Sequence, residues 1–185
     1  MTSPALSMPI LPTLPHLFEH SVIRFPDNAL MWEKQNGTYR STSYRETRER
    51  VHQCAAGFLS LGLRKGDRVA LISEGRNDWV VAELGILYAG GINVPLSVKI
   101  EEGADLKFRL AHARCRMIVV SGNHAHKVEA LRRELPDLEM VILLDPPAVA
   151  RPGVCFFDDL LRSGDAFPAT RRTEFEERWR SLRNG

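Results

Sequence analysis

The polar residue best placed to bind a cofactor is Lys99, which follows a short apolar run that ends at Leu96. Open α/β sheets bind their ligands at the carboxyl ends of the strands, and Lys99 would lie on that side of a sheet. The competing interpretation is a solvated lysine in a loop, which is the usual setting of a lysine. Lys99 is the one cofactor-binding candidate that residue type and chain order indicate.

Two further pairs of side chains could do chemistry, but each has a simpler interpretation. His124 and His126 could form a metal-binding pair, yet no carboxylate or thiol lies at ligand spacing. We therefore favour a surface loop at this point and predict no metal site. Asp158 and Asp159 could act as a paired acid and base, but adjacent acidic residues at a helix start interact favourably with the helix dipole.

The glycine-rich and nucleophile motifs of common enzyme classes do not occur in the 185 residues. The sequence contains no GxxxxGKS/T phosphate loop, no GxGxxG dinucleotide motif and no GxSxG nucleophile motif. Gly62 and the pair Gly90–Gly91 are interpreted as helix ends rather than phosphate contacts. We therefore predict no catalytic residue in this chain.

The three cysteines indicate buried thiols. Cys54, Cys115 and Cys155 are widely spaced, lie beside apolar residues and form no CxxC pair. Neither a zinc site nor a disulfide framework is therefore indicated. Free thiols suit a reducing compartment, so we predict a cytoplasmic protein.

Composition and charge describe an ordinary globular domain. Hydrophobic residues make up 44% and charged residues 26% of the 185 residues, which suits one α/β domain with a buried core. The net charge of +2 does not indicate a nucleic-acid partner, since the C-terminal arginines alternate with glutamates. The first 15 residues contain four prolines and no Lys or Arg, unlike a secretory signal. No segment approaches the ~20 apolar residues that span a bilayer.

The beginning of the chain is predicted to hold a Pro-rich arm, one helix and a hairpin. Residues 1–13 form the arm, and Thr13 can cap a helix that starts at Leu14 and ends at Phe25. Two short runs then flank Asn36–Gly37, a pair that tolerates the positive φ angles of a two-residue hairpin.

The strongest local signals lie between Ser43 and Leu96. Ser43 and Glu46 have the spacing of a capping box, in which each side chain accepts a hydrogen bond from the other residue's backbone. Asn77 is predicted to cap a helix that is apolar around much of its circumference and hence deeply buried. The predicted elements are a helix from Ser43 to Gly62, a buried strand over 68–73, a helix from Asn77 to Gly90 and a strand over 92–96.

The same alternation of strands and helices continues to residue 163. The further predicted elements are helices over 105–113 and 127–135, strands over 117–120, 140–144 and 155–157, and a helical turn over 158–162. Repeated strand–helix units imply parallel strands joined by right-handed crossovers. We therefore predict that residues 14–163 form one α/β subdomain, a mostly parallel sheet flanked by helices, with an N-terminal β-hairpin.

Residues 164–185 are predicted to be a linker followed by an amphipathic helix. Gly164 to Ala169 has the composition of a linker, and Thr173 and Glu176 have the spacing of a second capping box. The apolar stripe of the helix consists of Phe175, Trp179 and Leu182. That stripe needs a surface to cover it, and we expect it to pack on domains downstream of this chain.

The segment from Ser43 to Leu96 resembles the first two sequence motifs of the AMP-forming acyl-CoA synthetases of the adenylate-forming superfamily. The matching stretches are Ser43-Tyr44-Arg45-Glu46, an LGxxxGDRVA pattern from Leu61 to Ala70, the helix start Asn77-Asp78-Trp79, and an AGxxxVPL pattern from Ala89 to Leu96. Weaker similarity extends over roughly residues 14–144. The order and spacing of these stretches together make the resemblance specific.

The resemblance implies a ligase reaction in two steps for a longer parent protein. A fatty acid attacks the α-phosphate of ATP to give an acyl-adenylate and pyrophosphate, and the thiol of coenzyme A (CoA) then displaces AMP. The implied cofactors of the parent are ATP, Mg²⁺ and CoA, and the preferred substrate is a long-chain fatty acid. The family's ATP-phosphate loop and catalytic lysine belong to later motifs. The resemblance therefore implies an N-terminal fragment that is inactive and binds no cofactor by itself.

The resemblance also gives Lys99 a specific role. In some members of the family, the loop after the second motif approaches the CoA nucleotide. The matching residues are Ser97-Val98-Lys99-Ile100, in place of the Pro-rich loops that are commoner in the family. The resemblance thus implies a contact between Lys99 and the CoA nucleotide. It also implies a cytoplasmic parent, with peripheral membrane association as an alternative.

Two other functions stay open. The uncovered apolar stripe at Phe175, Trp179 and Leu182 would also suit a non-catalytic, ligase-like module that docks on a partner or forms a homodimer. An amino-acid adenylation domain shares the first two motifs and is the other candidate parent.

Overall fold

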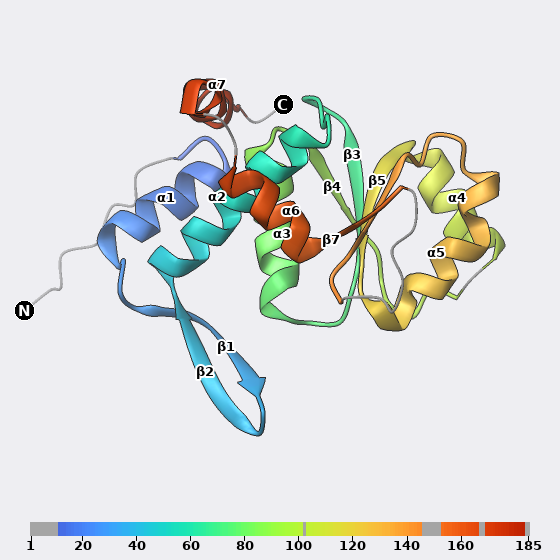
Figure 1. Cartoon of the computed structure of the whole chain (residues 1–185), viewed down its shortest axis with the longest axis horizontal. Coiled ribbons are helices and arrows are strands. Elements are labelled where there is room, and N and C mark those ends of the chain that lie inside the picture. The colour runs from blue at the N-terminus through green and yellow to red at the C-terminus, as the bar shows by residue number, and fades with distance from the viewer. Residues whose placement is uncertain (1–10, 102, 146–152, 167–168, 184–185) are drawn as a thin grey trace, which may run out of the picture.

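The computed structural model describes residues 11–101, 103–145, 153–166 and 169–183 (Figure 1). At its centre is a five-stranded sheet in which every adjacent pair of strands is parallel. In spatial order the strands are β4 (Ile92–Pro95), β3 (Arg68–Ile72), β5 (Cys115–Val120), β6 (Met140–Leu143) and β7 (Val154–Phe156). The predicted α/β fold with a mostly parallel sheet is confirmed. Residues 1–10 of the predicted Pro-rich arm lie outside the described residues.

Helices cover both faces of this sheet (Figure 1). One face carries α2 (Tyr44–Ser60), α3 (Asn77–Tyr88) and α6 (Phe157–Asp165), and the other carries α4 (Ala104–His112) and α5 (Ala125–Leu131). Successive strand residues alternate between the two faces, so Val69 and Leu71 of β3 join one apolar core while Ala70 and Ile72 join the other. Two outer helices, α1 (Leu14–Arg24) and α7 (Ala169–Arg180), lie against α2 and α3.

The predicted hairpin forms as a separate two-stranded sheet. It consists of β1 (Ala29–Gln35) and β2 (Thr38–Ser43), which pair antiparallel. Asn36 and Gly37 between them have φ angles of 49° and 84°, as a two-residue hairpin turn requires. Figure 1 shows the hairpin as an arm that extends away from the helices and the main sheet.

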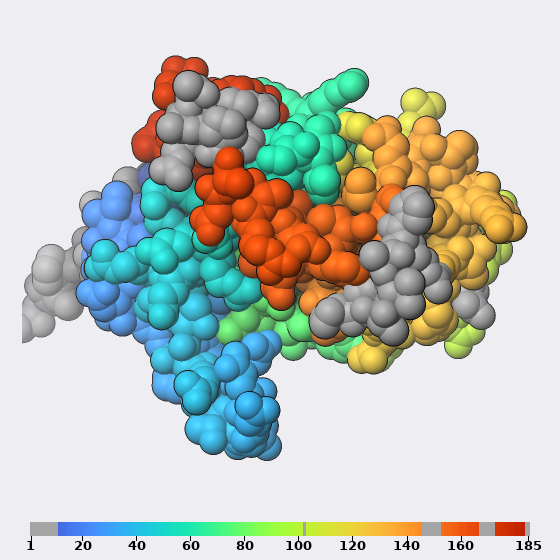
Figure 2. Space-filling view, viewed as in Figure 1, coloured from blue at the N-terminus to red at the C-terminus, as the bar shows by residue number. Residues whose placement is uncertain are grey.

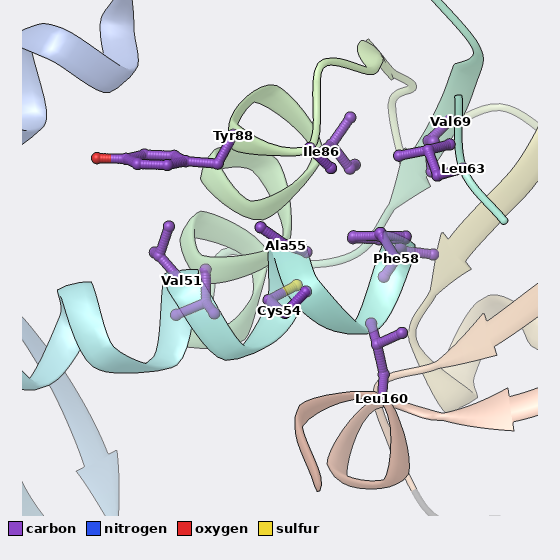
Figure 3. Close-up of a cluster of buried hydrophobic side chains, with 14 of the residues drawn as sticks. Val51, Cys54, Ala55, Phe58, Leu63, Val69, Ile86, Tyr88 and Leu160 are labelled. Atoms are coloured by element: carbon purple, nitrogen blue, oxygen red, sulfur yellow. The ribbon is translucent and has the colours of Figure 1, made fainter. Parts of the chain in front are cut away.

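Helix α2 lies at the centre of one core and is capped at both ends by its own sequence. The Ser43 N–H donates to Glu46 Oε2 at 2.8 Å and the Glu46 N–H donates to Ser43 Oγ at 3.2 Å, so the predicted capping box forms. At the other end Gly62 has a φ of 82°, and the Leu63 N–H donates back to the Phe58 carbonyl at 3.0 Å. Figure 3 shows α2 side chains among those of α3 and α6.

Two other predicted caps are wrong. Asn77 is the first residue of α3 rather than its cap, and its side-chain amide donates to Thr42 Oγ1 at 3.3 Å. A hairpin residue instead pairs with a free backbone group at the start of α3, because Glu33 Oε1 accepts the Asn77 N–H at 3.2 Å. Thr13 precedes α1, but its hydroxyl pairs with His16 Nδ1 at 2.7 Å. Pro15 in the first turn has no N–H for Thr13 to accept.

The predictions for residues 164–185 also need correction. Helix α6 runs through Gly164 and ends at Asp165, so these two residues are not linker. Helix α7 begins at Ala169, four residues before Thr173, and the second capping box is therefore absent. Thr173 cannot cap the N-terminus of α7, because it lies inside that helix.

The apolar stripe of α7 is covered by this chain itself. Phe175 and Trp179 are 5% and 3% exposed, and Leu182 lies half-buried beside the same core. The rings of Phe175 and Trp179 lie 6.5 Å and 5.5 Å from the ring of Tyr88 on α3. The expectation that the stripe packs on a downstream domain is therefore wrong, and among the described residues this stripe offers no exposed apolar surface for docking.

Two glycines let α6 cross α2 at close range. A Cβ at Gly164 would overlap the Gln53 carbonyl oxygen of α2, and a Cβ at Gly57 would overlap the Leu160 carbonyl oxygen of α6. Neither position allows even a methyl group without moving backbone. These contacts fix the distance between the two helices and bring the buried Leu160 onto α2 (Figure 3).

A partly buried ionic cluster ties α1 to α2 and α3. Glu19 of α1 lies 2.8 Å from both Arg48 Nε and His52 Nε2 of α2, and it accepts the Tyr88 hydroxyl of α3 at 3.0 Å. Partial burial raises the pKa of Glu19, but hydrogen bonds from His52 and Arg48 outweigh it and hold the pKa at about 2. The carboxylate therefore stays ionised in the folded chain well into the acidic range.

We expect Gly164→Ala to lower the free energy of unfolding by about 1–3 kcal/mol, because the added methyl group meets the backbone of α2. Denaturant unfolding followed by circular dichroism measures this change. Gly75→Ala is the matched control, because no atom lies within 4 Å of a Cβ built there and the residue is exposed. Equal midpoints for the Gly164 and Gly75 variants would contradict the close crossing of α2 and α6.

We expect Glu19→Gln to cost about 1–3 kcal/mol at neutral pH, because charged donors on α2 lose their partner. The folded pKa of about 2 lies below the ordinary value of 4.5, so the ionised carboxylate contributes its full stability above pH 4.5. That contribution is lost as pH falls from 4.5 towards 2. Unfolding midpoints measured across this window should therefore converge for the wild type and Glu19→Gln.

Glu49→Gln, at an exposed glutamate of α2, is the control and should change stability little at any pH. A constant difference between the wild type and Glu19→Gln over the acidic window would contradict the ionic role of Glu19.

Candidate functional site

The carboxyl ends of four parallel strands meet at one edge of the main sheet, which we call the carboxyl edge. The segments that follow these strands are 73–76 after β3, 96–100 after β4, 121–124 after β5 and 144–145 after β6. Backbone hydrogen bonds extend the sheet into them, from Leu96 N–H to the Leu71 carbonyl at 2.9 Å and from Ser121 N–H to the Ile72 carbonyl at 3.0 Å. Ligands of open α/β sheets bind at this edge.

Glu74 joins the segment after β3 to the segment after β5. Its Oε1 accepts Asn123 Nδ2 at 2.9 Å and lies 3.2 Å from His124 Nε2. The Asn123 hydrogen bond is the largest of the causes that hold the pKa of Glu74 at about 2. Glu74 is therefore an ionised acceptor at neutral pH and cannot serve as a general acid.

Arg76 and Asp145 connect three of the same segments. Arg76 Nη1 lies 2.8 Å from Asp145 Oδ1, and Asp145 Oδ2 accepts the Gly122 N–H at 2.7 Å. Partial burial raises the pKa of Asp145, but the Gly122 N–H and the Arg76 guanidinium together hold it below its ordinary value. The charges of this network are satisfied by one another, so the network fixes the loops of the carboxyl edge.

Lys99 lies at the carboxyl edge, as the sequence predicts, with its side chain exposed. Within the described part of the chain, no carboxylate or carbonyl pairs with its ammonium group. The loop around it is nevertheless held in place, because Lys127 Nζ of α5 donates to the Val98 carbonyl at 3.0 Å and to the Ile100 carbonyl at 2.8 Å. Lys99 therefore presents a cation on a fixed loop, without a partner among the described residues.

The other candidate side chains from the sequence do not form a site. His124 is the last residue of a 3-10 turn (Gly122–His124) and His126 lies in α5, so the predicted surface loop is wrong at both positions. His124 pairs with Glu74 and His126 is exposed. No group of three or more His, Cys, Asp or Glu within the described ranges could hold a metal ion.

The acidic pair and the thiols have the structural roles that the sequence indicates. Asp158 and Asp159 lie in the first turn of α6, where Asp159 pairs with Arg162. Cys54 and Cys115 are buried and Cys155 is half-buried, and burial raises the pKa of each thiol, to about 11 for Cys115. All three are therefore protonated at neutral pH and poor nucleophiles.

A separate cleft of about 510 Å³ lies between α2, α6 and α7. Its lining includes Arg48, His52, Gln53, Asp165, Phe175 and Glu176. Its polar groups are largely paired already, since Arg48 and His52 bind Glu19 and Gln53 Nε2 donates to Asp165 at 3.0 Å. The cleft therefore offers a ligand fewer free groups than the carboxyl edge.

The sequence indicates Lys99 but not the residues that fix the loops of the carboxyl edge. Lys127, Glu74, Arg76 and Asp145 each have a partner at least 23 residues away, as Glu74 has in Asn123, 49 residues along the chain. The one available signal was their place just after buried strands, which Glu74, Arg76 and Asp145 share. Lys127 carried no such signal because it lies inside a helix.

Comparison with known proteins identifies the family to which this chain is similar. A family model described as AMP-binding enzyme matches residues 18–173. Among curated relatives, human mitochondrial acyl-coenzyme A synthetase ACSM5 is 29% identical over 153 residues, 82% of this chain and 26% of the relative. Mouse mitochondrial medium-chain acyl-CoA ligase ACSF2 is 31% identical over 160 residues, 76% of this chain and 25% of the relative. Bovine long-chain-fatty-acid–CoA ligase ACSBG1 is 25% identical over 158 residues, 84% of this chain and 22% of the relative.

Solved structures show the same fold. The anthranilate CoA ligase AuaEII in complex with anthranoyl-AMP superposes with a TM-score of 0.74 at 21% identity, over 84% of this chain and 29% of that one. The A-PCP didomain of carboxylic acid reductase from Segniliparus rugosus gives a TM-score of 0.72 at 17% identity, over 88% of this chain and 28% of that one. The chain spans about a quarter of the length of the curated relatives it matches. Since the family model extends from α1 into α7, this chain belongs to the AMP-binding enzyme family of adenylate-forming ligases, which includes the acyl-CoA synthetases.

Proposed function

We propose that this chain is the N-terminal part of an ATP-dependent fatty acyl-CoA ligase. The reaction would convert a fatty acid, ATP and CoA into an acyl-CoA, AMP and pyrophosphate. The family match over residues 18–173 supports this proposal most strongly, because the relatives it groups with are acyl-CoA synthetases. We further propose long-chain fatty acids as substrates, which the similarity to ACSBG1 supports.

In this proposal the chain supplies scaffold and the rest of the parent supplies catalysis. The 185 residues contain none of the later motifs that hold ATP phosphates in this family. The carboxylates of the carboxyl edge are ionised and paired with Arg76, Asn123 or backbone N–H groups, so they position loops. The described residues offer no cluster that fits Mg²⁺, and we assign that ion to the rest of the parent.

The proposed location of the parent is the cytoplasm. None of the helices within the described residues is long and apolar enough to cross a membrane. The predicted division of the chain at residue 163 falls inside α6, whereas domains beyond residue 185 and a homodimer stay predictions.

Within the same proposal, Lys99 contacts the CoA nucleotide. Its ammonium group is exposed at the carboxyl edge, and Lys127 holds the loop that carries it. An exposed cation on a fixed loop suits a phosphate group, since the backbone that carries it loses little conformational freedom on binding.

Exchange of labelled pyrophosphate into ATP, in the presence of a fatty acid, tests the ligase proposal. We expect no exchange from the 185-residue chain alone. The complete product of the gene that contains these residues should show exchange that depends on the fatty acid, and should form acyl-CoA when CoA is added. Exchange by the isolated chain would contradict the assignment of catalysis to the rest of the parent. If the complete product exchanges pyrophosphate into ATP when amino acids are supplied, but not when a fatty acid is supplied, the parent is an amino-acid adenylation enzyme instead.

The Lys99 contact predicts a selective change in the complete product. Lys99→Ala should raise the KM for CoA about two- to fivefold, as expected for one exposed ion pair, and leave the KM for ATP and the rate of pyrophosphate exchange unchanged. Lys99→Arg should restore most of the affinity. Lys65→Ala is the control, because Lys65 is another exposed lysine, placed before β3 at the opposite edge of the sheet. An unchanged KM for CoA in Lys99→Ala would overturn the contact.

A further inference from the structure

The two faces of the β1–β2 hairpin differ in what they contact. Residues that pair across the hairpin share a face, so Trp32 and Ser41 lie on the same side as Lys34 and Tyr39. Glu33 lies on the opposite side, as successive residues of a strand do. Glu33 Oε1 accepts the Asn77 N–H of α3, so the side with Glu33 faces the body of the protein.

Exposure confirms that the other side faces away. Met31, Glu33 and Thr42 are half-buried, whereas all four residues on the far side are exposed. The far side, which we call the aromatic face, consists of Trp32, Lys34, Tyr39 and Ser41. Trp32 is 63% exposed and Tyr39 is 66% exposed. Figures 1 and 2 show the hairpin standing clear of the helices and the main sheet, and no other described segment covers this face.

The composition of the aromatic face suits the interface of a lipid bilayer. Tryptophan and tyrosine combine an apolar ring with one polar group, and both concentrate where the acyl chains of a membrane meet its headgroups. Lys34 is the one ionisable cation of this face and no carboxylate accompanies it. A lysine beside interfacial aromatic residues adds attraction to anionic lipid headgroups.

A second copy of this chain fits the same face poorly. A two-fold axis through the aromatic face would bring two Lys34 side chains together, and like charges directly opposed weaken an interface. Stable protein interfaces also bury roughly 1,600 Å², more than four side chains on a two-stranded arm can supply.

We propose that the aromatic face of the hairpin binds the surface of anionic lipid membranes, with Trp32 and Tyr39 at the headgroup boundary and Lys34 against the headgroups. This inference goes beyond the ligase proposal and does not depend on it. It requires no membrane-spanning element, because the contact is peripheral.

Sedimentation of the full 185-residue chain with vesicles tests the proposal. The chain should bind phosphatidylcholine vesicles that contain phosphatidylserine, and the double variant Trp32→Ala, Tyr39→Ala should lose about tenfold or more in affinity. Lys34→Gln should bind about fivefold more weakly to these vesicles and unchanged to phosphatidylcholine alone. Phe108→Ala is the matched control, because Phe108 on α4 is 64% exposed and lies outside the hairpin.

Fluorescence quenching gives a second readout that does not depend on loss of binding. Brominated lipids should quench tryptophan fluorescence of the wild type, and Trp32→Phe should keep its vesicle binding but lose that quenching. The remaining tryptophans are half-buried Trp79 and buried Trp179, so they lie out of reach of the acyl chains. Equal quenching in Trp32→Phe, or equal vesicle binding by the double variant and Phe108→Ala, would overturn the proposal. Self-association that the double variant abolishes in the absence of lipid would overturn it in favour of a dimer interface.

Discussion

The structure depends on one constraint, which is that a parallel sheet must be covered on both faces. In β3 and β5 every second side chain enters one core and the others enter the second core, so each face needs its own layer of helices. The crossover helices α3 and α4 supply the two layers on opposite sides, as right-handed connections from neighbouring strands allow. Helices α2 and α6 can both fit over one face because Gly57 and Gly164 permit their close approach.

The same constraint creates the candidate site. Parallel strands bring all their carboxyl ends to one edge, and the polar segments that follow them meet there. Most of the polar side chains in these segments pair with one another, as Arg76 does with Asp145 and Glu74 with Asn123. The carboxyl edge is therefore fixed in place and presents the exposed Lys99. This arrangement fits our proposal, in which this chain helps to build the site and the rest of the parent performs the reaction.

Local signals predicted local structure well. The capping box of Ser43 and Glu46 and the turn at Asn36–Gly37 formed as predicted, because each depends on residues at most three positions apart. The order of strands and helices could also be predicted, since periodicity of apolar residues is a property of each segment alone. The family resemblance followed from the same segments.

Predictions failed where a distant residue decides the outcome. The N–H of Asn77 is accepted by Glu33, 44 residues earlier, and Gly164, which was expected in a linker, lies in α6 directly against the Gln53 backbone of α2. The stripe of α7 seemed uncovered because nothing in the sequence shows that Tyr88 and the rings around it form a surface to receive it. Lys127 supports the Lys99 loop from another helix for the same reason.

Helices of this chain cover both faces of its sheet, and α7 closes over α2 and α3. Native-state hydrogen exchange of the 185-residue chain, resolved by residue, tests it most directly. Amides of β3, β5 and α2 should exchange only through global unfolding, and amides of α7 near Phe175 and Trp179 should be strongly protected. Exchange of α7 at the rate of an unstructured peptide, or separate unfolding of the two faces of the sheet, would contradict the account.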